Sequence, residues 1–353
     1  MQKFTIKLIP GDGIGIDVIN EAVRVLQRLS ELHGGVKFDF QPLPWSCEYY
    51  LKTGCMMPKD GLQILADCDS ILLGAVGFPG VPDHISLREL LLPIRVGFDQ
   101  YVNLRPVKLL PGLSSPLKNE AIDFVVIREN SEGEYSGMGD WLFRGKENEV
   151  VLQTGVFSRK GVERIIRYAY EMAHRENKTL TSVSKSNALN YSMVFWDQVF
   201  AEVGKEYPDV KTQVVNVDAA ALFFVKQPQK FQVVVTSNLF GDILTDLGAA
   251  IAGGMGLAAG ANLNPERTFP SMFEPIHGSA PDIMGKGIAN PLASVWSASQ
   301  MLDFFGYEEW GAKVLGAVED LMVDGSVLSP DMGGTATTRE VGDAVVRRLE
   351  AMA

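Results

Sequence analysis

The sequence predicts an α/β protein built in two lobes around a largely parallel sheet. Short apolar runs alternate with amphipathic patterns along most of the chain, an order typical of parallel strands covered by helices. The chain has 353 residues, whereas single hydrophobic cores stop growing at about 250–300 residues. Apolar residues make up 46% of the sequence, which is ample for large buried interiors. We therefore expect two lobes of α/β type.

The expected elements follow from the spacing of apolar residues. Apolar runs predict strands at residues 4–9, 36–41, 70–73, 122–127, 180–183, 214–217 and 232–236. Apolar residues at helical spacing predict helices at residues 16–32, 161–176, 190–203, 242–252, 291–305 and 338–352. Residues 133–158 interrupt this alternation and predict β-hairpins without a helix. Such an arm either pairs with another subunit or is an ordinary surface flap.

The stretch PGDGIG, residues 10–15, stands where a dinucleotide-binding loop would begin. Its glycines follow the spacing G-x-G-x-G, whereas the Rossmann fingerprint is G-x-G-x-x-G with an acidic residue about 20 positions later. Glu31 lies near that distance but ends a helical pattern. We interpret the stretch as a tight strand-to-helix turn in which Asp12 is available to cap the helix.

Charge and cysteine content narrow the class of function. The formal net charge of −11 disfavours nucleic acid or an anionic membrane as a general partner, but leaves room for a local cationic pocket. Three cysteines without a C-x-x-C pair predict a reducing compartment, with no disulfide framework and no cysteine metal site. The N-terminus lacks a signal-peptide pattern, and no apolar run reaches 18 residues. We expect a cytoplasmic enzyme.

Carboxylates in two segments are candidate metal ligands. Asp242 and Asp246 are four residues apart and share one face of an expected helix. Oxygen ligands of this kind suit Mg²⁺ or Mn²⁺. The alternative is a solvated acidic face. Asp218 ends one expected strand and begins a helix, so it is either a third metal ligand or an N-cap.

Cationic and proton-transfer candidates lie at the ends of other apolar runs. Arg105 and Arg128 follow such runs, and Arg95 precedes them in a helical stretch. Three arginines at one place would clamp a carboxylate, although a surface salt bridge is the alternative for each. Lys185 follows a strand and is either a general base or an exposed lysine. Tyr135 is either a proton donor or a packed aromatic ring.

The segment FEPIHGSAPDIMGKGIANP, residues 273–291, reads as a long, glycine-punctuated loop. Loops of this length in compact domains are usually functional. Its small residues allow a flat ligand to approach the backbone, and His277 suits stacking on an adenine. Asp282 suits a ribose diol, which would favour NAD over NADP because the carboxylate repels a 2′-phosphate.

These segments together resemble the β-decarboxylating dehydrogenases, which act on isocitrate, 3-isopropylmalate, homoisocitrate, tartrate or D-malate. The strings NLFGDILTD and HGSAPDIMGKGIANP carry the resemblance, which runs from IPGDGIG to DMGGTATT. It implies the two-domain isopropylmalate-dehydrogenase-like fold with a shared, twisted, mixed sheet, which is not a Rossmann fold. The nucleotide-binding domain would comprise residues 1–98 and 253–353. Residues 99–252 would form the substrate, metal and dimerisation domain, with a hairpin arm at about 133–158.

The resemblance also implies roles for residues. It implies that Arg95, Arg105 and Arg128 bind the substrate carboxylate, and that Lys185, Tyr135 and Asp218 take part in catalysis. The implied metal ligands are Asp218, Asp242 and Asp246. The implied NAD-binding residues are Gly74, Ala75, His277, Gly278, Ser279, Ala280, Asp282, Ile283 and Asn290. In this family Lys185 and Asp218 would come from the partner subunit of a homodimer.

Within the family, several segments resemble the tartrate and D-malate dehydrogenases, including RENSEGEYSG. Glu89 and Leu91 stand where isocitrate enzymes carry a Ser-x-Asn pair, which disfavours isocitrate. Arg88 and Glu89 add an expected local ion pair near the nicotinamide. We expect NAD-dependent and Mn²⁺- or Mg²⁺-dependent oxidation of D-malate or tartrate, with K⁺ as an additional ion implied by the subgroup. The alternatives are a 3-isopropylmalate dehydrogenase and a non-catalytic carboxylate-binding protein of the same fold.

Overall fold

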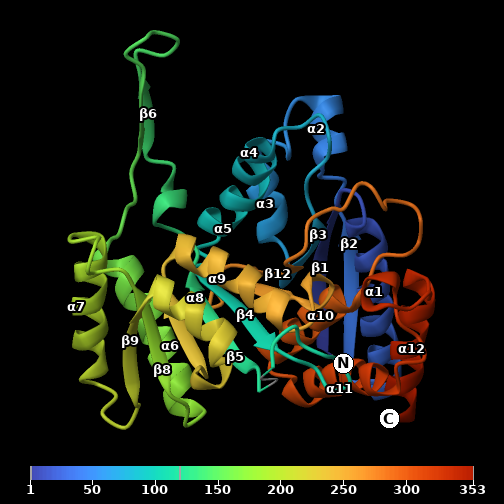
Figure 1. The fold of residues 1–353 in the computed structure, drawn as a ribbon. Coiled ribbons are helices and arrows are strands. Elements are labelled where there is room, and N and C mark those ends of the chain that lie inside the picture. Colours follow the sequence, from blue (N-terminus) through green and yellow to red (C-terminus); the bar gives the residue numbers. More distant parts are fainter. Residues whose placement is uncertain (1, 119–120, 353) are drawn as a thin grey trace. The chain divides into compact units, whose positions relative to one another are not determined.

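The computed structural model describes residues 2–118 and 121–352 as helices, strands and connecting loops (Figure 1). The chain divides into two compact units. Unit 1 contains Met1–Gln100, Leu109–Pro116 and Ala252–Ala353, and unit 2 contains Tyr101–Lys108 and Leu117–Ile251. Both units combine strands with covering helices, which confirms the predicted α/β class. In the described part of the chain, each helix is too short or too polar to cross a bilayer.

The strands of unit 1 are mostly parallel. They lie in the order β2-β1-β3-β12-β11, and only the β11–β12 pair is antiparallel. Their bounds are β1 Gln2–Gly11, β2 Val36–Pro42, β3 Ser70–Ala75, β11 Ala259–Leu263 and β12 Ser271–Pro275. Strands β3, β11 and β12 are buried along their whole length, as expected for strands covered on both faces.

The long helices of unit 1 pack on these strands and on one another (Figure 1). Helices α1 and α10 contact strands directly, and α12 and α11 pack against them. Their bounds are α1 Gly15–His33, α10 Leu292–Phe304, α11 Glu308–Asp324 and α12 Thr338–Ala351. The shorter segments are α2 Cys47–Thr53, α3 Gly61–Ala66, α4 Asp83–Ser86, the π-helix η1 Leu87–Leu91, α5 Leu92–Gly97, and the 3₁₀ helices η4 Met255–Leu257 and η5 Pro330–Met332.

The main strands of unit 2 lie in the order β4-β5-β10-β8-β9. The β4–β5 pair is antiparallel and the others are parallel. Their bounds are β4 Val102–Lys108, β5 Asp123–Glu129, β8 Leu180–Ser184, β9 Thr212–Asn216 and β10 Val233–Thr236. Helices α6 and α9 both contact β5 and β10, and they pack against α7 and α8 respectively. Their bounds are α6 Arg159–Arg175, α7 Ser192–Gly204, α8 Val217–Lys226 and α9 Asn238–Ile251, with the 3₁₀ helix η3 Pro228–Lys230 after α8.

A two-stranded arm projects from unit 2 (Figure 1). It consists of β6 Gly139–Leu142 paired antiparallel with β7 Val150–Gln153. All eight residues of these two strands are exposed. The prediction of a segment without any helix was wrong in detail, because the 3₁₀ helix η2 Glu134–Ser136 precedes the arm.

Two local predictions need correction. Asp12 does not cap the helix that follows it, since the N-cap of α1 is Ile14 without a side-chain hydrogen bond. The buried Asp12 carboxylate instead accepts hydrogen bonds from the backbone N–H groups of Cys47, Glu48 and Gly77. The glycine-punctuated loop predicted at residues 273–291 (the late loop) is shorter than expected, because Ser271–Pro275 forms the buried strand β12.

Candidate functional site

The centre of the candidate site in unit 2 is the carboxylate of Asp242, in the first half of α9. The guanidinium of Arg128, at the end of β5, donates a hydrogen bond to its Oδ1. Nη1 of Arg105 lies 3.6 Å from the same oxygen and 3.9 Å from Oδ1 of Asp246. Helical spacing places the two carboxylates on one side of α9, as the sequence predicts. The structure therefore brings two predicted arginines and two predicted carboxylates together.

Both arginines are held by polar groups of α9. Arg105 is 6% exposed, and its Nη1 donates to Oγ1 of Thr245 at 2.6 Å. Arg128 is 2% exposed and is held by Asn238. The sequence predicted Arg105 at the end of an apolar run, but the residue lies in the middle of β4. Buried guanidinium groups keep their charge and attract anions, which suits the binding of a substrate carboxylate.

Tyr135 joins the same cluster. Its phenol donates a hydrogen bond of 2.7 Å to Oδ2 of Asp242, and the Arg128 guanidinium carbon lies 5.5 Å from its ring centroid. Gly133 and Gly137, on either side of η2, both have positive φ angles, which allow the chain to turn sharply there. Tyr135 is partly exposed, and the bond to Asp242 orients its hydroxyl group.

Lys185 and Asp218 form a separate pair in unit 2. Lys185 follows β8, and its Nζ donates to Oδ1 of Asp218 at 2.5 Å. Asp218 lies in the first turn of α8, whose N-cap is Asn216. The hydrogen bond from Lys185 lowers the pKa of the Asp218 carboxyl. Asp218 is therefore an exposed, ionised carboxylate with an ammonium group beside it.

The donor set suits a hard divalent cation, since carboxylate oxygens are its usual protein ligands. Burial raises the pKa of the Asp246 carboxyl, while the nearby Arg105 guanidinium lowers it and the Asp242 carboxylate raises it further. Among residues 2–118 and 121–352, no three His, Cys, Asp or Glu side chains are grouped to hold a metal ion. A single chain thus offers Asp242 and Asp246 together, without Asp218 as a third ligand.

Arg95 lies in unit 1, in α5, and is 6% exposed. Its Nη2 donates to Oε1 of Glu274 at 2.8 Å, and Nδ2 of Asn262 donates to the same oxygen at 2.7 Å. Its convergence with Arg105 and Arg128 stays a prediction. The expected ion pair of Arg88 with Glu89 was wrong, because both side chains are exposed and form no such pair in the described part of the chain.

The predicted cofactor segments lie together in unit 1. The backbone N–H of Ile14 donates to the carbonyl oxygen of Ser279 at 2.8 Å, and Oγ of Ser279 donates to the carbonyl of Gly77. A Cβ atom on Gly13 would lie 1.9 Å from that Ser279 oxygen, so only glycine fits. The first glycine turn and the late loop therefore form one structure.

The end of β3 is equally tight. A Cβ atom on Gly74 would lie 2.4 Å from the carbonyl oxygen of Pro10, and the Ala75 carbonyl accepts the Asp12 N–H at 2.7 Å. Further along the late loop, Ala280 and Ile283 pack against a small core formed by α1 and Ala289. Asp282 is exposed, and a Cβ atom added to Gly278 would have no other atom of the described residues within 4 Å. The loop thus has an anchored side and an open side.

Two side chains in this segment have features of a ligand site. Nε2 of His277 is buried and has no hydrogen-bond partner among the described residues, and burial lowers the pKa of its imidazole. Asn290 is 6% exposed; its Oδ1 accepts the Leu292 N–H, and its Nδ2 donates to Asp331 at 3.0 Å. The orphaned nitrogen and the open loop fit a nucleotide cofactor.

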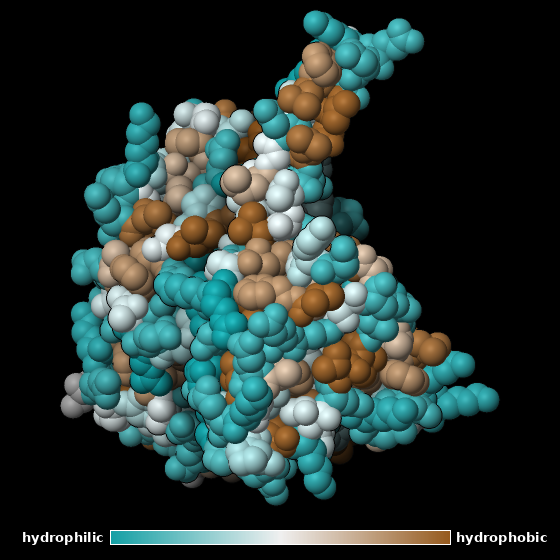
Figure 2. Space-filling model, turned by 90° about the vertical axis from the view of Figure 1, so that its left-hand side faces the viewer, coloured by the Kyte–Doolittle hydropathy of each residue, from teal (hydrophilic) through white to brown (hydrophobic). Residues whose placement is uncertain are grey.

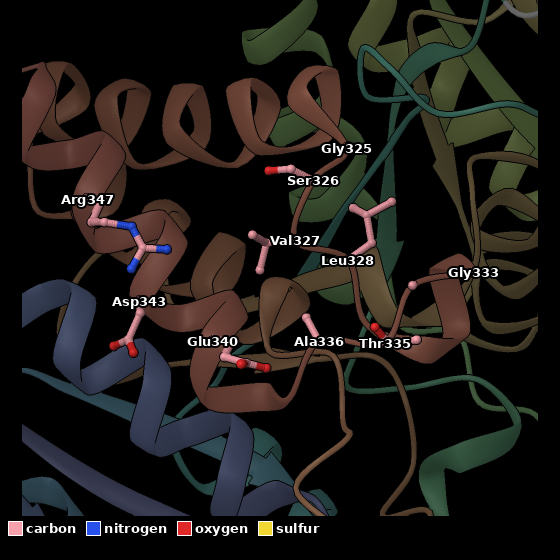
Figure 3. Close-up of a pocket in the computed structure, with 11 residues that line it drawn as sticks. Gly325, Ser326, Val327, Leu328, Gly333, Thr335, Ala336, Glu340, Asp343 and Arg347 are labelled. Atoms are coloured by element: carbon pink, nitrogen blue, oxygen red, sulfur yellow. The ribbon is translucent and has the colours of Figure 1, made fainter.

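A pocket of about 730 Å³ lies elsewhere in unit 1, between the α11–α12 connection and α12 (Figure 3). Its charged lining side chains are Glu340, Asp343 and Arg347. None of the described residues predicted for catalysis or binding lines this pocket. Its size alone therefore does not assign it to the reaction.

Comparison with known proteins decides the family. A family model described as isocitrate/isopropylmalate dehydrogenase matches residues 5–345. The chain belongs to this family. It is 51% identical to the D-malate dehydrogenase (decarboxylating) of Escherichia coli over 358 residues, covering 98% of this chain and 99% of that protein. It is also 51% identical to the tartrate dehydrogenase/decarboxylase of Pseudomonas putida, covering 98% and 97% of the two chains.

Family membership confirms both the expected fold and the resemblance to decarboxylating dehydrogenases. The crystal structure of isocitrate dehydrogenase from Methylococcus capsulatus matches with a TM-score of 0.88 and 35% identity, over 99% of each chain. The members matched at about half identity are decarboxylating oxidoreductases by name, and this chain is an enzyme of that kind.

Several residues that shape the site were not predicted from the sequence. They are Asn238, Gly241 and Thr245 around the arginines, and Glu274 and Asp331 in unit 1. The string SNLFGD contained a signal for the first two, since Asn238 lies one helical turn before Asp242 and Gly241 lies directly before it. Glu274 and Asp331 had no comparable signal, because their respective partners, Arg95 and Asn290, are distant in the sequence.

Proposed function

We propose that the protein oxidises D-malate, tartrate or both with NAD⁺, and decarboxylates the oxaloacetate formed from D-malate. The observation that carries the proposal is the cluster of Arg105, Arg128, Tyr135, Asp242 and Asp246. It combines cations for a dicarboxylate, oxygens for a divalent metal and a phenol for proton transfer. The names of the two half-identical relatives support the same substrates.

In this proposal the arginines bind the carboxylate that leaves as CO₂. Their guanidinium groups are permanently charged and buried, so they hold the anion in place without protonating it. Arg95 of unit 1 is the third arginine of the proposed clamp, and its charge is balanced by Glu274. Positioning of this kind lowers the entropy cost of the reaction.

Lys185 is the proposed general base for the 2-hydroxyl group of the substrate. Its amine must lose a proton before it can accept one, and Asp218 beside it accepts hydrogen bonds from either form. Tyr135 is the proposed acid for the second step. After CO₂ leaves, the enolate of pyruvate needs a proton at C3, and the partly exposed phenol can deliver one.

The proposed cofactors are held by residues already described. Asp242 and Asp246, with Asp218 of a second subunit, would bind Mn²⁺ or Mg²⁺. Gly74, Ala75, the segment His277–Ile283 and Asn290 would bind NAD. When bound, the metal would supply the charge that acidifies the substrate hydroxyl group, and NAD⁺ would supply the hydride acceptor for C2. Exposed Asp282 would reject a 2′-phosphate, so NAD⁺ is preferred over NADP⁺.

A homodimer is part of the proposal. Hydrophobic side chains gather along the projecting arm of unit 2 (Figure 2). Trp141, Phe143, Val151 and Leu152 are each about half exposed, at 49%, 55%, 54% and 50%. Apolar residues on an isolated hairpin need a partner surface, because a two-stranded hairpin is marginally stable alone. A second copy of the chain would cover the arm and supply Lys185 and Asp218 to each site.

Co-expression tests this shared site. Lys185→Met should be inactive alone, and Asp246→Asn should have little activity at the Mn²⁺ concentration that half-saturates the wild type. A mixed dimer contains one site with both wild-type residues, so co-expression of the two variants should recover part of the activity. Sites built within one chain would give no recovery.

The main experiment is a substrate panel with purified protein. It contains D-malate, L-tartrate, meso-tartrate and 3-isopropylmalate, each with Mn²⁺ and with NAD⁺ or NADP⁺, and NADH or NADPH absorbance is followed. We expect activity on D-malate or a tartrate with NAD⁺, which Lys185→Met abolishes while NADH binding survives. A strong preference for 3-isopropylmalate, or no turnover of any substrate, would overturn the proposal.

A further inference from the structure

One buried amide connects two groups that the proposed reaction uses separately. Asn238, the first residue of α9, is 2% exposed. Its Oδ1 accepts hydrogen bonds from Arg128, from Nε at 2.9 Å and from Nη2 at 2.7 Å. Its Nδ2 donates to the backbone carbonyl of Glu132 at 3.0 Å. One side chain thus joins an arginine of the cluster to the turn that leads to Tyr135.

The chemistry of the partners fixes the orientation of this amide. A guanidinium group only donates hydrogen bonds and a carbonyl only accepts them, so Oδ1 must face Arg128 and Nδ2 must face Glu132. Two bonds to one oxygen hold the plane of the guanidinium. They direct its remaining nitrogen, Nη1, toward Asp242.

The opposite side of the same turn is held by a second buried group. The carboxylate of Glu129, 3% exposed, accepts hydrogen bonds from the N–H and hydroxyl groups of Ser131 at 2.8 and 2.6 Å. It also accepts one from the N–H of Glu132 at 2.9 Å. Glu132 is therefore fixed at its N–H by Glu129 and at its carbonyl by Asn238. Tyr135 follows three residues later.

We propose that Asn238 is a positioning residue for this reaction. Its amide sets the guanidinium plane of Arg128 and, through the carbonyl of Glu132, the place of the Tyr135 phenol. The inference rests on the proposed function, because that function assigns Arg128 to substrate binding and Tyr135 to proton delivery. Misplacement of a reacting group by about 1 Å can cost about 10²-fold in rate, so such a connection matters to turnover.

Two substitutions separate the two contacts. Asn238→Asp keeps an acceptor for Arg128 but has no N–H for Glu132, whereas Asn238→Ala removes both. Ser237→Ala is the matched control, since Ser237 is buried next to Asn238 and its hydroxyl has no hydrogen bond in the described part of the chain.

The expected kinetic result is a split between the two variants. Asn238→Ala should raise the KM for D-malate at least about tenfold and slow oxaloacetate decarboxylation by a similar factor or more. Asn238→Asp should keep the KM for D-malate within about threefold but lose decarboxylation like the alanine variant. Ser237→Ala should match the wild type. Equal KM increases in both Asn238 variants, or no loss of decarboxylation in Asn238→Asp, would overturn the proposal.

A second readout does not depend on turnover. Protein labelled with 3-fluorotyrosine gives a ¹⁹F resonance for Tyr135, identified by its loss in Tyr135→Phe. This resonance should shift in both Asn238 variants and stay in place in Ser237→Ala. An unchanged resonance in both variants would refute the positioning role even if the enzyme turns over every substrate. A wild-type protein without activity on the panel would refute the proposed function, while the resonance still tests Asn238.

Discussion

The phenol of Tyr135 and the carboxylate of Asp242 are joined by a hydrogen bond of 2.7 Å within one chain. The proposed proton donor is therefore already in contact with the proposed metal ligand. This contact orients the hydroxyl group and ties its position to α9. It also gives a phenylalanine substitution a clear meaning, because the change removes the hydroxyl group and this bond but keeps the ring.

Tyr135→Phe should spare oxidation of D-malate more than decarboxylation of added oxaloacetate. A general acid typically contributes about 10²–10⁴-fold, so the decarboxylation rate should fall within that range. Both rates can be followed separately, by NADH absorbance and by pyruvate formation. Tyr191→Phe, a change at an 84% exposed ring, is the control. Normal pyruvate formation in the Tyr135 variant would make Tyr135 a packed aromatic ring only.

Gly241→Ala should weaken substrate binding although it replaces no charged side chain. A Cβ atom there would lie 2.6 Å from Cγ of Arg128, whose buried side chain has little room to move. The displaced guanidinium should raise the KM for D-malate by about tenfold or more and leave the KM for NAD⁺ within about twofold. Gly316→Ala is the control, because among the described residues its Cβ would meet just Cε of Met352, at 3.8 Å. Identical KM values for both variants would contradict the proposed role of Arg128.

Asp246→Asn should raise the Mn²⁺ concentration needed for half activity. The amide keeps the size of the side chain but removes a charge four residues from Asp242 on the same helix. We expect a rise of at least about tenfold, measured by titrating metal-free protein with Mn²⁺. Asp320→Asn, an exposed change on α11, should leave the titration unchanged. A superimposable curve for Asp246→Asn would remove it from the metal site.

The carboxyl group of Asp303, near the end of α10, should make the stability of the wild type depend on pH in a way that Asp303→Asn does not. Burial, followed by the charge of Glu308, raises the pKa of its carboxyl from 3.8 to about 6. Because the folded pKa is higher than the unfolded one, the stabilisation is complete below pH 3.8 and is lost as the pH rises through about 6. Asp303→Asn stays neutral and avoids this loss.

The melting temperature of Asp303→Asn should therefore equal that of the wild type near pH 4. Above pH 6.5, the melting temperature of Asp303→Asn should be higher than that of the wild type by about 2 °C. This gain is small because the side chain is partly screened by solvent. Calorimetry of both proteins across this range measures the difference, with Asp320→Asn as the control. A constant difference at all pH values would contradict the assigned cause.

The fold could be predicted where the spacing of apolar residues was regular. Helix α1 and strand β8 were expected within two residues of their observed bounds, because each buries a continuous face. Strand β4 was missed, since it contains Arg105 and Pro106 and pairs antiparallel with β5. A charged residue and a proline both weaken the pattern of a strand, and the pairing that stabilises it comes from a separate segment.

The site could be predicted where its residues lie close together in the sequence. Asp242 and Asp246 share a helix, so their spacing alone placed them side by side. The contact of Tyr135 with Asp242 spans 107 positions, and that of Arg95 with Glu274 spans 179. Contacts of this separation depend on tertiary packing, which no local pattern contains. Asp12 illustrates the same point, because its partners Cys47 and Gly77 lie far along the chain.

The close approach of Gly13 to the Ser279 carbonyl limits how this enzyme can be re-engineered. Attempts to change cofactor preference would naturally transplant the late loop from a relative that uses another nucleotide. Such a graft would arrive without the turn against which it was shaped, at a place where even one Cβ atom on residue 13 would lie 1.9 Å from the Ser279 carbonyl oxygen. Residues 11–15 and 277–291 should therefore be exchanged as one module, although more than 250 residues of sequence separate them.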